Sequence, residues 1–195
     1  MIYQSPIALT DKDVFPIRQE ISIKGKNKGA TYIDEDKIFL INSNDKIILK
    51  IDGNKYQLIE YHFHTPSEHT INKKEYPAEI HYVFYKLDGE ICHKKHHDIC
   101  GKCSKISEED ETILVIGRVI KNYKCSDNLS KLQVDIPSTY FEYDGSLTGE
   151  GDEGVPVRWI VGEKYIRLSL KEIEKFTKTS KPIQPLDNRI ILHSC

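Results

Sequence analysis

The sequence lacks any apolar run that approaches the roughly 20 residues needed to cross a membrane as a helix. Its first stretch, Met1–Pro6, lacks both the basic segment and the apolar segment of a secretory signal. We therefore expect a cytoplasmic chain with no membrane span, although a mature or trimmed chain, or a virion protein, would look the same.

The chain also lacks an excess of either charge. It has 28 Lys and Arg against 30 Asp and Glu, and the two signs are interspersed. This balance argues against a nucleic-acid partner and against binding to an anionic membrane surface. With 195 residues, 38% apolar and 30% charged, the composition is typical of one globular domain with its own hydrophobic core. We predict a single domain over residues 1–195, with one insertion at about 91–110.

The five cysteines are an odd number, and no secretory signal accompanies them. The default prediction is therefore reduced thiols and not a disulfide framework. We expect Cys125 and Cys195 to carry no chemistry.

The predicted insertion is rich in cysteine and histidine. Cys100-Gly-Lys-Cys103 has the spacing of a zinc knuckle, and Cys92 with His96 would complete a tetrahedral Cys₃His site for a second, structural zinc. His93 and His97 are equally placed as the fourth ligand, so the ligand set is open. A solvated polar loop with free thiols, or a disulfide under oxidising conditions, is the alternative.

Runs rich in Ile, Val, Leu and Tyr alternate with turn residues along the chain, which predicts a mainly β fold. We expect strands at Ala30–Ile33, Lys37–Ile41, Lys46–Ile51, Lys55–His64, Ala78–Val83, Thr112–Ile120, Tyr140–Leu147 and Val155–Val161. Asp52-Gly53-Asn54 is a hairpin signal. We expect short helices at Ser126–Gln133 and, from the capping box Ser169–Glu172, through about Phe176. Met1–Lys28 should be irregular with one short strand.

Three histidines point to a metal. His62 and His64 are two apart in a predicted strand, so they face the same side about 6.5–7 Å apart. His81 lies in a second strand after a short polar connection, and a hairpin would bring it to the first pair. Three imidazoles with an empty fourth position are the minimal open catalytic zinc site. Alternatively, the three histidines could be half-buried polar residues without a metal. The carboxylates interleaved with them, Glu60, Glu68 and Glu79, make simple packing a poorer explanation.

Several separated motifs occur in the order found in α-class carbonic anhydrases, and the chain resembles that family. They are Gln4-Ser5-Pro6-Ile7, Tyr61–Thr70, Ala78–His81, Tyr143–Thr148, Val157–Val161 and Gln184–Arg189. The wording of the second motif is closest to the bacterial branch. The resemblance implies a large, mostly antiparallel central sheet with few short helices, and one zinc at the base of a cleft.

The resemblance also implies roles for individual residues. The zinc ligands would be His62, His64 and His81, and the fourth ligand a water that becomes hydroxide near neutral pH. Thr148 would accept a hydrogen bond from that hydroxide and donate its own to Glu68.

Two further carboxylates would orient ligand histidines: Glu60 would orient His62, and Glu79 would orient His81. Glu60 stands where the family usually has Gln, which would make the zinc more electron-rich. An apolar wall would hold CO₂, formed by Val83, Val115, Leu147 and Trp159. Residue type alone would assign these four to the core.

The chain also departs from the family pattern. Gly149–Glu153 replaces Thr-Pro-Pro after Thr148, which predicts a more flexible and more acidic rim. The position of the proton-shuttle histidine falls near Asp45 or Lys46, neither of which is a histidine, so we expect slower turnover. The aromatic segment that usually precedes Gln4 is missing.

The sequence therefore supports two hypotheses. The first is zinc-dependent, reversible hydration of carbon dioxide to bicarbonate and a proton, with CO₂ and bicarbonate as the small-molecule partners. The second is a carbonic-anhydrase-like binding or attachment module with little catalysis. The complete set of three histidines with Thr148 and Glu68 favours the enzyme, because a binding module has no need of both hydrogen-bonding partners.

Overall fold

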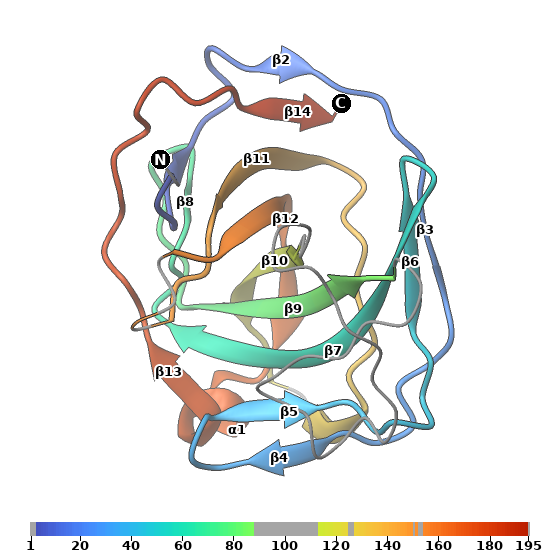
Figure 1. Cartoon of the computed structure of the whole chain (residues 1–195). Helices are drawn as coiled ribbons and strands as arrows, with labels where there is room; N and C mark the ends of the chain where they lie inside the picture. Colours follow the sequence, from blue (N-terminus) through green and yellow to red (C-terminus); the bar gives the residue numbers. More distant parts are fainter. Residues whose placement is uncertain (1–2, 88–112, 125–126, 150, 152–153, 195) are drawn as a thin grey trace.

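One large mixed sheet dominates the computed structural model, which describes residues 3–87, 113–124, 127–149, 151 and 154–194 (Figure 1). It is a 12-stranded sheet whose main path runs β2-β14-β11-β12-β10-β9-β7-β5-β4, with β13, β3 and β6 attached beside this path. A separate two-stranded sheet joins β1 to β8. The predicted fold class, mainly β with few short helices, is confirmed.

The strands have the following bounds. They are β1 (Ala8–Leu9), β2 (Phe15–Pro16), β3 (Ile21–Lys24), β4 (Thr31–Ile33), β5 (Ile38–Leu40), β6 (Ile48–Ile51), β7 (Asn54–Thr65), β8 (Thr70–Ile71), β9 (Ala78–Lys86), β10 (Ile113–Asn122), β11 (Tyr140–Ser146), β12 (Pro156–Leu168), β13 (Thr177–Thr179) and β14 (Leu192–Ser194). The helical segments are a 3-10 turn at Leu129–Lys131, α1 (Leu170–Ile173) and a 3-10 turn at Glu174–Phe176.

The middle of the sheet is covered on both faces. The first eight residues of β10 are all buried, and so are the first seven of β9. A strand buried on both sides needs apolar residues without alternation, which explains the continuous run Ile113–Ile116. β10 pairs antiparallel with β9 but parallel with β12, so the sheet is mixed and not purely antiparallel.

Alternation along the strands separates two cores. Tyr61 and Tyr82 point to one face and join its large aromatic cluster. Val83 and Trp159 point to the other face and join a second cluster. His62 and His81 are neighbours of the first pair in sequence, so their side chains lie on the second face.

Two turns set the register around the histidines. Asp52 and Gly53 have φ of 49° and 76° and close the β6–β7 hairpin, as predicted. Asn72 and Lys73 also have positive φ, at 50° and 66°, in the connection before β9. The pairing of β7 with β9 then sets His62 directly opposite His81, as the hairpin prediction required.

The prediction for the N-terminal segment was wrong. The first 28 residues contribute three short strands, β1, β2 and β3, and not one. These strands are too short to show a periodic pattern, and their pairing partners lie far along the chain.

The predicted capping box at Ser169 does not form. Its side chain makes no cap bond, and α1 gives way to a 3-10 turn after one helical turn. The reason is a pair of hydrogen bonds with Asp127, which comes from another part of the chain. Glu172 Oε2 accepts the backbone N–H of Asp127 at 2.6 Å, while Asp127 Oδ2 accepts the N–H of Ser169 at 3.0 Å. The carboxylate expected to cap the helix therefore holds a loop in place.

In the part of the chain that the structure describes, none of the helices has the length and apolar character of a membrane span.

Candidate metal centre

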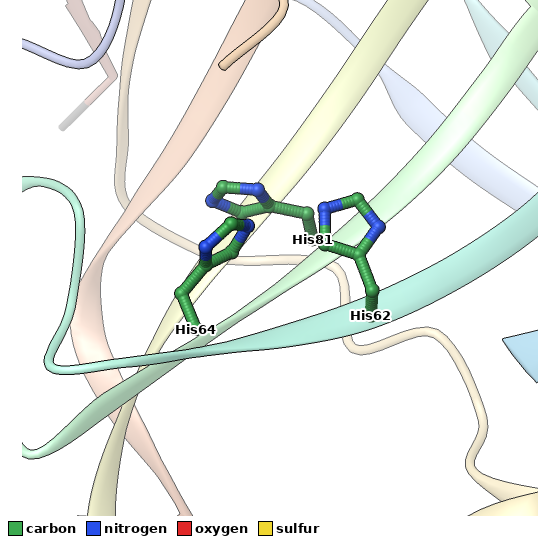
Figure 2. A group of neighbouring side chains, drawn as sticks. All are labelled: His62, His64 and His81. Carbon is green, nitrogen blue, oxygen red and sulfur yellow. The ribbon is translucent and has the colours of Figure 1, made fainter. Parts of the chain in front are cut away.

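Three buried imidazoles meet on one face of the sheet (Figure 2). β7 supplies His62 and His64 from positions two apart, and β9 supplies His81. The ring centroids lie 5.0, 5.3 and 4.7 Å from one another. One nitrogen from each ring lies within 4.8 Å of the other two, so the group could hold a metal ion. The histidines predicted as ligands are thus brought together.

A hydrogen bond occupies the other nitrogen of each ring. His62 Nδ1 is 3.2 Å from Glu60 Oε1, and His64 Nδ1 is 3.2 Å from the carbonyl oxygen of Thr179. His81 Nε2 is 3.1 Å from Glu79 Oε1. All three partners are acceptors, so each of these nitrogens carries the proton. The lone pairs that remain are Nε2 of His62 and His64 and Nδ1 of His81.

Burial keeps two of these rings neutral. It lowers the pKa of His62 well below its usual value, and the neighbouring Lys178 and His81 add to this effect. Burial likewise lowers the pKa of His64, with further contributions from His81 and His62. A neutral imidazole is the form that binds a metal.

One buried nitrogen without a hydrogen-bond partner supports a metal at this cluster. His64 Nε2 is fully buried and has no hydrogen-bond partner among the described residues. An unpaired buried lone pair is costly, and a metal bond would satisfy it. Three imidazole nitrogens this close together are a donor set that suits zinc, with a fourth position for water.

Glu79 joins the histidine cluster to a second buried histidine that the sequence analysis did not assign. Its Oε1 is 2.8 Å from His69 Nδ1 as well as 3.1 Å from His81 Nε2, and its Oε2 accepts the His69 backbone N–H at 2.9 Å. Burial alone would raise the pKa of Glu79, but the charges of His69 and His81 and their hydrogen bonds hold it well below its usual value. The carboxylate is therefore an ionised acceptor.

The network continues to the N-terminal segment. His69 Nε2 lies 2.6 Å from the Tyr143 hydroxyl, which is hydrogen-bonded to Ser5 Oγ at 3.2 Å. Ser5 Oγ also accepts the backbone N–H of Ser146 at 3.2 Å. A buried chain of hydrogen bonds thus connects His81 with Ser5. No spacing rule could have assigned His69 or Tyr143 to it, because their partners lie in other segments of the chain.

His69, Glu79 and His81 are also close enough together to hold an ion. However, three N–H groups already bind the carboxylate of Glu79, and the Tyr143 hydroxyl engages the remaining nitrogen of His69. We interpret this group as support for His81 and not as a second metal site.

Glu68 and Thr148 meet beside the histidines, as the resemblance implied. Burial raises the pKa of Glu68, while the charge of His81, the backbone N–H of Lys181 and the hydroxyl of Thr148 act to lower it. Glu68 Oε1 accepts the Lys181 N–H at 2.9 Å. Its Oε2 has no bonding partner within hydrogen-bond distance among the described residues. The Lys181 N–H therefore fixes one oxygen of the carboxylate, and the other oxygen lies 3.9 Å from His81 Nδ1.

Three of the four residues predicted as an apolar wall lie on neighbouring strands, and Leu147 follows the end of β11. Val83 on β9 faces Val115 on β10, which in turn pairs with Trp159 on β12. These three are fully or almost fully buried, and Leu147 packs against the same cluster. The rings of Trp159 and His81 are 4.9 Å apart. The apolar surface therefore begins directly beside the histidine cluster.

Two other positions singled out in the sequence have different outcomes. Asp45, near the expected shuttle position, is buried and accepts the backbone N–H of Lys28 at 2.8 Å, so its carboxylate supports a turn. The segment from Cys92 to Cys103 lies outside the described residues, as do Cys125 and Cys195. A second metal at that segment stays a prediction.

Known proteins share both the sequence pattern and the fold. The family model described as eukaryotic-type carbonic anhydrase matches residues 2–194. A carbonic anhydrase of Pectobacterium atrosepticum is 26% identical over 164 residues, which cover 78% of this chain and 64% of the relative. One of Nostoc sp. is 26% identical over 206 residues, covering 98% of this chain and 75% of the relative. The match thus spans slightly less than two thirds of the first relative.

Solved structures agree. A hyperthermostable carbonic anhydrase from an active hydrothermal vent chimney superposes with a TM-score of 0.71 at 26% identity, covering 99% of this chain and 88% of its own. The α-carbonic anhydrase of Thermovibrio ammonificans, solved with the inhibitor sulfanilamide, also gives 0.71, at 24% identity, covering 97% of this chain and 86% of its own.

Proposed function

Because the chain belongs to the eukaryotic-type (α) carbonic anhydrase family, we propose that it catalyses the reversible hydration of carbon dioxide to bicarbonate and a proton. One observation carries the proposal. Three buried histidines each present one free ring nitrogen to a common point, and the carboxylate of Glu68 lies beside them. Three imidazole ligands would leave the fourth position of a tetrahedral zinc for water.

The proposed metal is zinc, held by Nε2 of His62, Nε2 of His64 and Nδ1 of His81. When bound, zinc lowers the pKa of a water ligand to about 7 and so supplies a nucleophile near neutral pH. The protein's contribution would be to keep the rings of His62 and His64 neutral and to fix the orientation of all three rings. Glu60, Glu79 and the Thr179 carbonyl do this through the other nitrogen of each ring.

Thr148 and Glu68 would orient the reacting water. An ionised Glu68 can only accept hydrogen bonds, so the Thr148 hydroxyl must donate its proton toward the carboxylate. Thr148 Oγ1 can then only accept a hydrogen bond from the water, so the water would donate a proton to it. The water's own lone pair is thereby left facing the substrate carbon.

The apolar wall would receive the substrate. Carbon dioxide carries no charge and needs no donor, so a surface of Val83, Val115 and Trp159 can hold it without competing for the water. Bicarbonate is charged and is poorly accommodated there, which favours its release. Proton export would depend on external buffer, since Asp45 is buried in contacts with Lys28. Turnover should therefore be slower than in fast members of the family.

The test combines zinc content per chain with a stopped-flow assay of CO₂ hydration. We expect the native chain to hold zinc at the histidine cluster and to be active. His64→Ala removes the ligand whose free nitrogen is an unpaired buried atom, and should lose most zinc and reduce activity to background. His193→Ala is the control, because that histidine lies on β14 beside Glu163 and should leave both readouts unchanged.

Other outcomes discriminate between the hypotheses. Full activity of His64→Ala would show that the ligands are misassigned. A chain that binds zinc at the cluster but does not hydrate CO₂ would favour the attachment module. Two zincs per chain, with one lost in a Cys100→Ser variant, would support the additional structural site in the insertion.

A further inference from the structure

Gly117 lies in the middle of β10, on the face of the sheet that carries the histidine cluster. Its neighbours on that face, Val115 and Val119, are buried β-branched residues. A glycine inside a buried strand costs backbone entropy and packing. Gly117 is not among the residues of positive φ, so the backbone conformation does not require glycine there. The remaining reason is space.

One atom fills the space that a side chain would take. A Cβ added to Gly117 would lie 2.8 Å from Glu79 Oε1, and only 3.6 Å from Val161 Cγ2 and 3.7 Å from His81 Cδ2. Gly117 pairs directly with His81 across the β9–β10 ladder. The Glu79 carboxylate therefore passes over the bare backbone of β10 to reach the ring of His81.

This carboxylate cannot easily move aside. Its Oε1 is held by His69 Nδ1 and His81 Nε2, its Oε2 is held by the His69 backbone N–H, and the side chain is fully buried. A separation under 3.0 Å is essentially never seen for a real Cβ. Any added side chain would therefore have to lengthen one of these bonds or displace the strand.

We propose that Gly117 is a positioning residue for His81. The absence of a side chain lets Glu79 bind Nε2 of His81, and that bond keeps Nδ1 free and turned to the metal. Gly117 touches neither metal nor substrate and acts only through Glu79. The inference rests on the proposed function only in taking zinc as the ion that His81 holds.

The primary test is the rate at which zinc leaves Gly117→Ala in excess chelator. We expect zinc affinity to fall about 10- to 100-fold, the usual loss when the partner of a ligand histidine is disturbed, with correspondingly faster release. The absorption spectrum of the cobalt-substituted protein should also change, because the orientation of His81 changes. Ile116→Ala is the matched control, since it disturbs the same strand on the opposite face and should leave zinc release unchanged.

A double variant tests whether the effect passes through Glu79. Glu79→Ala removes the carboxylate and vacates the space, so adding Gly117→Ala should cause no further loss of zinc. If Gly117→Ala alone does not fold, the Glu79→Ala/Gly117→Ala chain should still unfold at no lower denaturant concentration than Glu79→Ala. Equal zinc loss in both backgrounds, native zinc release by Gly117→Ala, or a double variant less stable than Glu79→Ala would each overturn the proposal.

These readouts do not depend on catalysis. Zinc release and the cobalt spectrum can be measured in a chain that hydrates no CO₂, so failure of the proposed reaction would leave the inference about Gly117 standing. Conversely, if the native chain is active and Gly117→Ala releases zinc at the native rate, the inference about Gly117 is wrong and the proposed reaction still stands.

Discussion

The histidine cluster and Thr148 reach the same site from segments that are held in place differently. His62, His64 and His81 lie on β7 and β9, which pair with each other and with further strands on both outer sides. Thr148 follows the end of β11 and is only half-buried. Behind it, the loop is closed by a backbone bond from the Leu147 N–H to the Val155 carbonyl oxygen, at 3.1 Å.

The difference separates two requirements of the proposed reaction. Metal binding needs fixed ring nitrogens, and the hydrogen bonds of Glu60, Glu79 and Thr179 supply them within the sheet. Orientation of the water needs one hydroxyl at the end of a strand. Disturbing Thr148 should therefore reduce catalysis without reducing zinc content, whereas disturbing the sheet should reduce both.

The largest effect is expected at Thr148. Thr148→Ala removes the hydroxyl that is hydrogen-bonded to Glu68 and that would accept from the water in the proposed reaction. We expect kcat/KM for CO₂ hydration to fall about 10²- to 10³-fold, as for the loss of one preorganised hydrogen-bonding group, with zinc per chain unchanged.

The matched control is Thr148→Ser, which keeps the hydroxyl and should retain most activity. If Thr148→Ala were as active as the native chain, the loop would not bring the hydroxyl to the reacting water, and the altered residues after it would be the reason.

The sequence was sufficient for the cluster because its geometry is local. A spacing of two in a strand, and one short connection to the next strand, already place His62, His64 and His81 on one face. The β-branched runs likewise gave the long central strands. Resemblance to the family then added Thr148 and Glu68, which are 80 positions apart and related by no periodic rule.

What the sequence did not reveal depends on contacts between distant segments. His69 gains its role from Glu79 and Tyr143, and Ser5 from Tyr143. The capping box predicted at Ser169 does not form, because Asp127, far away in the chain, donates its backbone N–H to the carboxylate of Glu172. Short edge strands such as β13 exist only through their partner β7. Local propensity does not contain this information.

A smaller effect is expected in the pH dependence of stability, to which the histidine cluster contributes and Thr148 does not. His62 and His64 have folded-state pKa values well below 6.5. Below pH 6.5 the unfolded chain therefore binds more protons than the folded one, and stability falls as the pH falls. For the metal-free protein we expect stability to fall as the pH falls below 6.5, by at most about 1.36 kcal/mol per pH unit for each of the two groups.

Denaturant unfolding of the metal-free protein at several pH values measures this slope. His64→Leu removes one of the two groups and should reduce the slope by about half. An unchanged slope in that variant would mean that the buried histidines are not neutral in the folded state.

The smallest effect is expected at Glu60, whose Oε1 lies 3.2 Å from His62 Nδ1. Glu60→Gln keeps an acceptor for that nitrogen but removes the negative charge that makes the ring more basic. We expect zinc affinity to weaken by less than about tenfold, and the pH profile of CO₂ hydration to shift to lower pH because a less electron-rich metal acidifies its water more. Glu60→Ala removes the acceptor as well and should cost about 10- to 100-fold in zinc affinity. Equal losses in the two variants would show that charge alone, and not orientation, is what Glu60 contributes. In that case only His64 and His81, which are held by the Thr179 carbonyl and by Glu79, would be fixed in orientation by their hydrogen bonds. The difference from Thr148 would then apply to two of the three histidines.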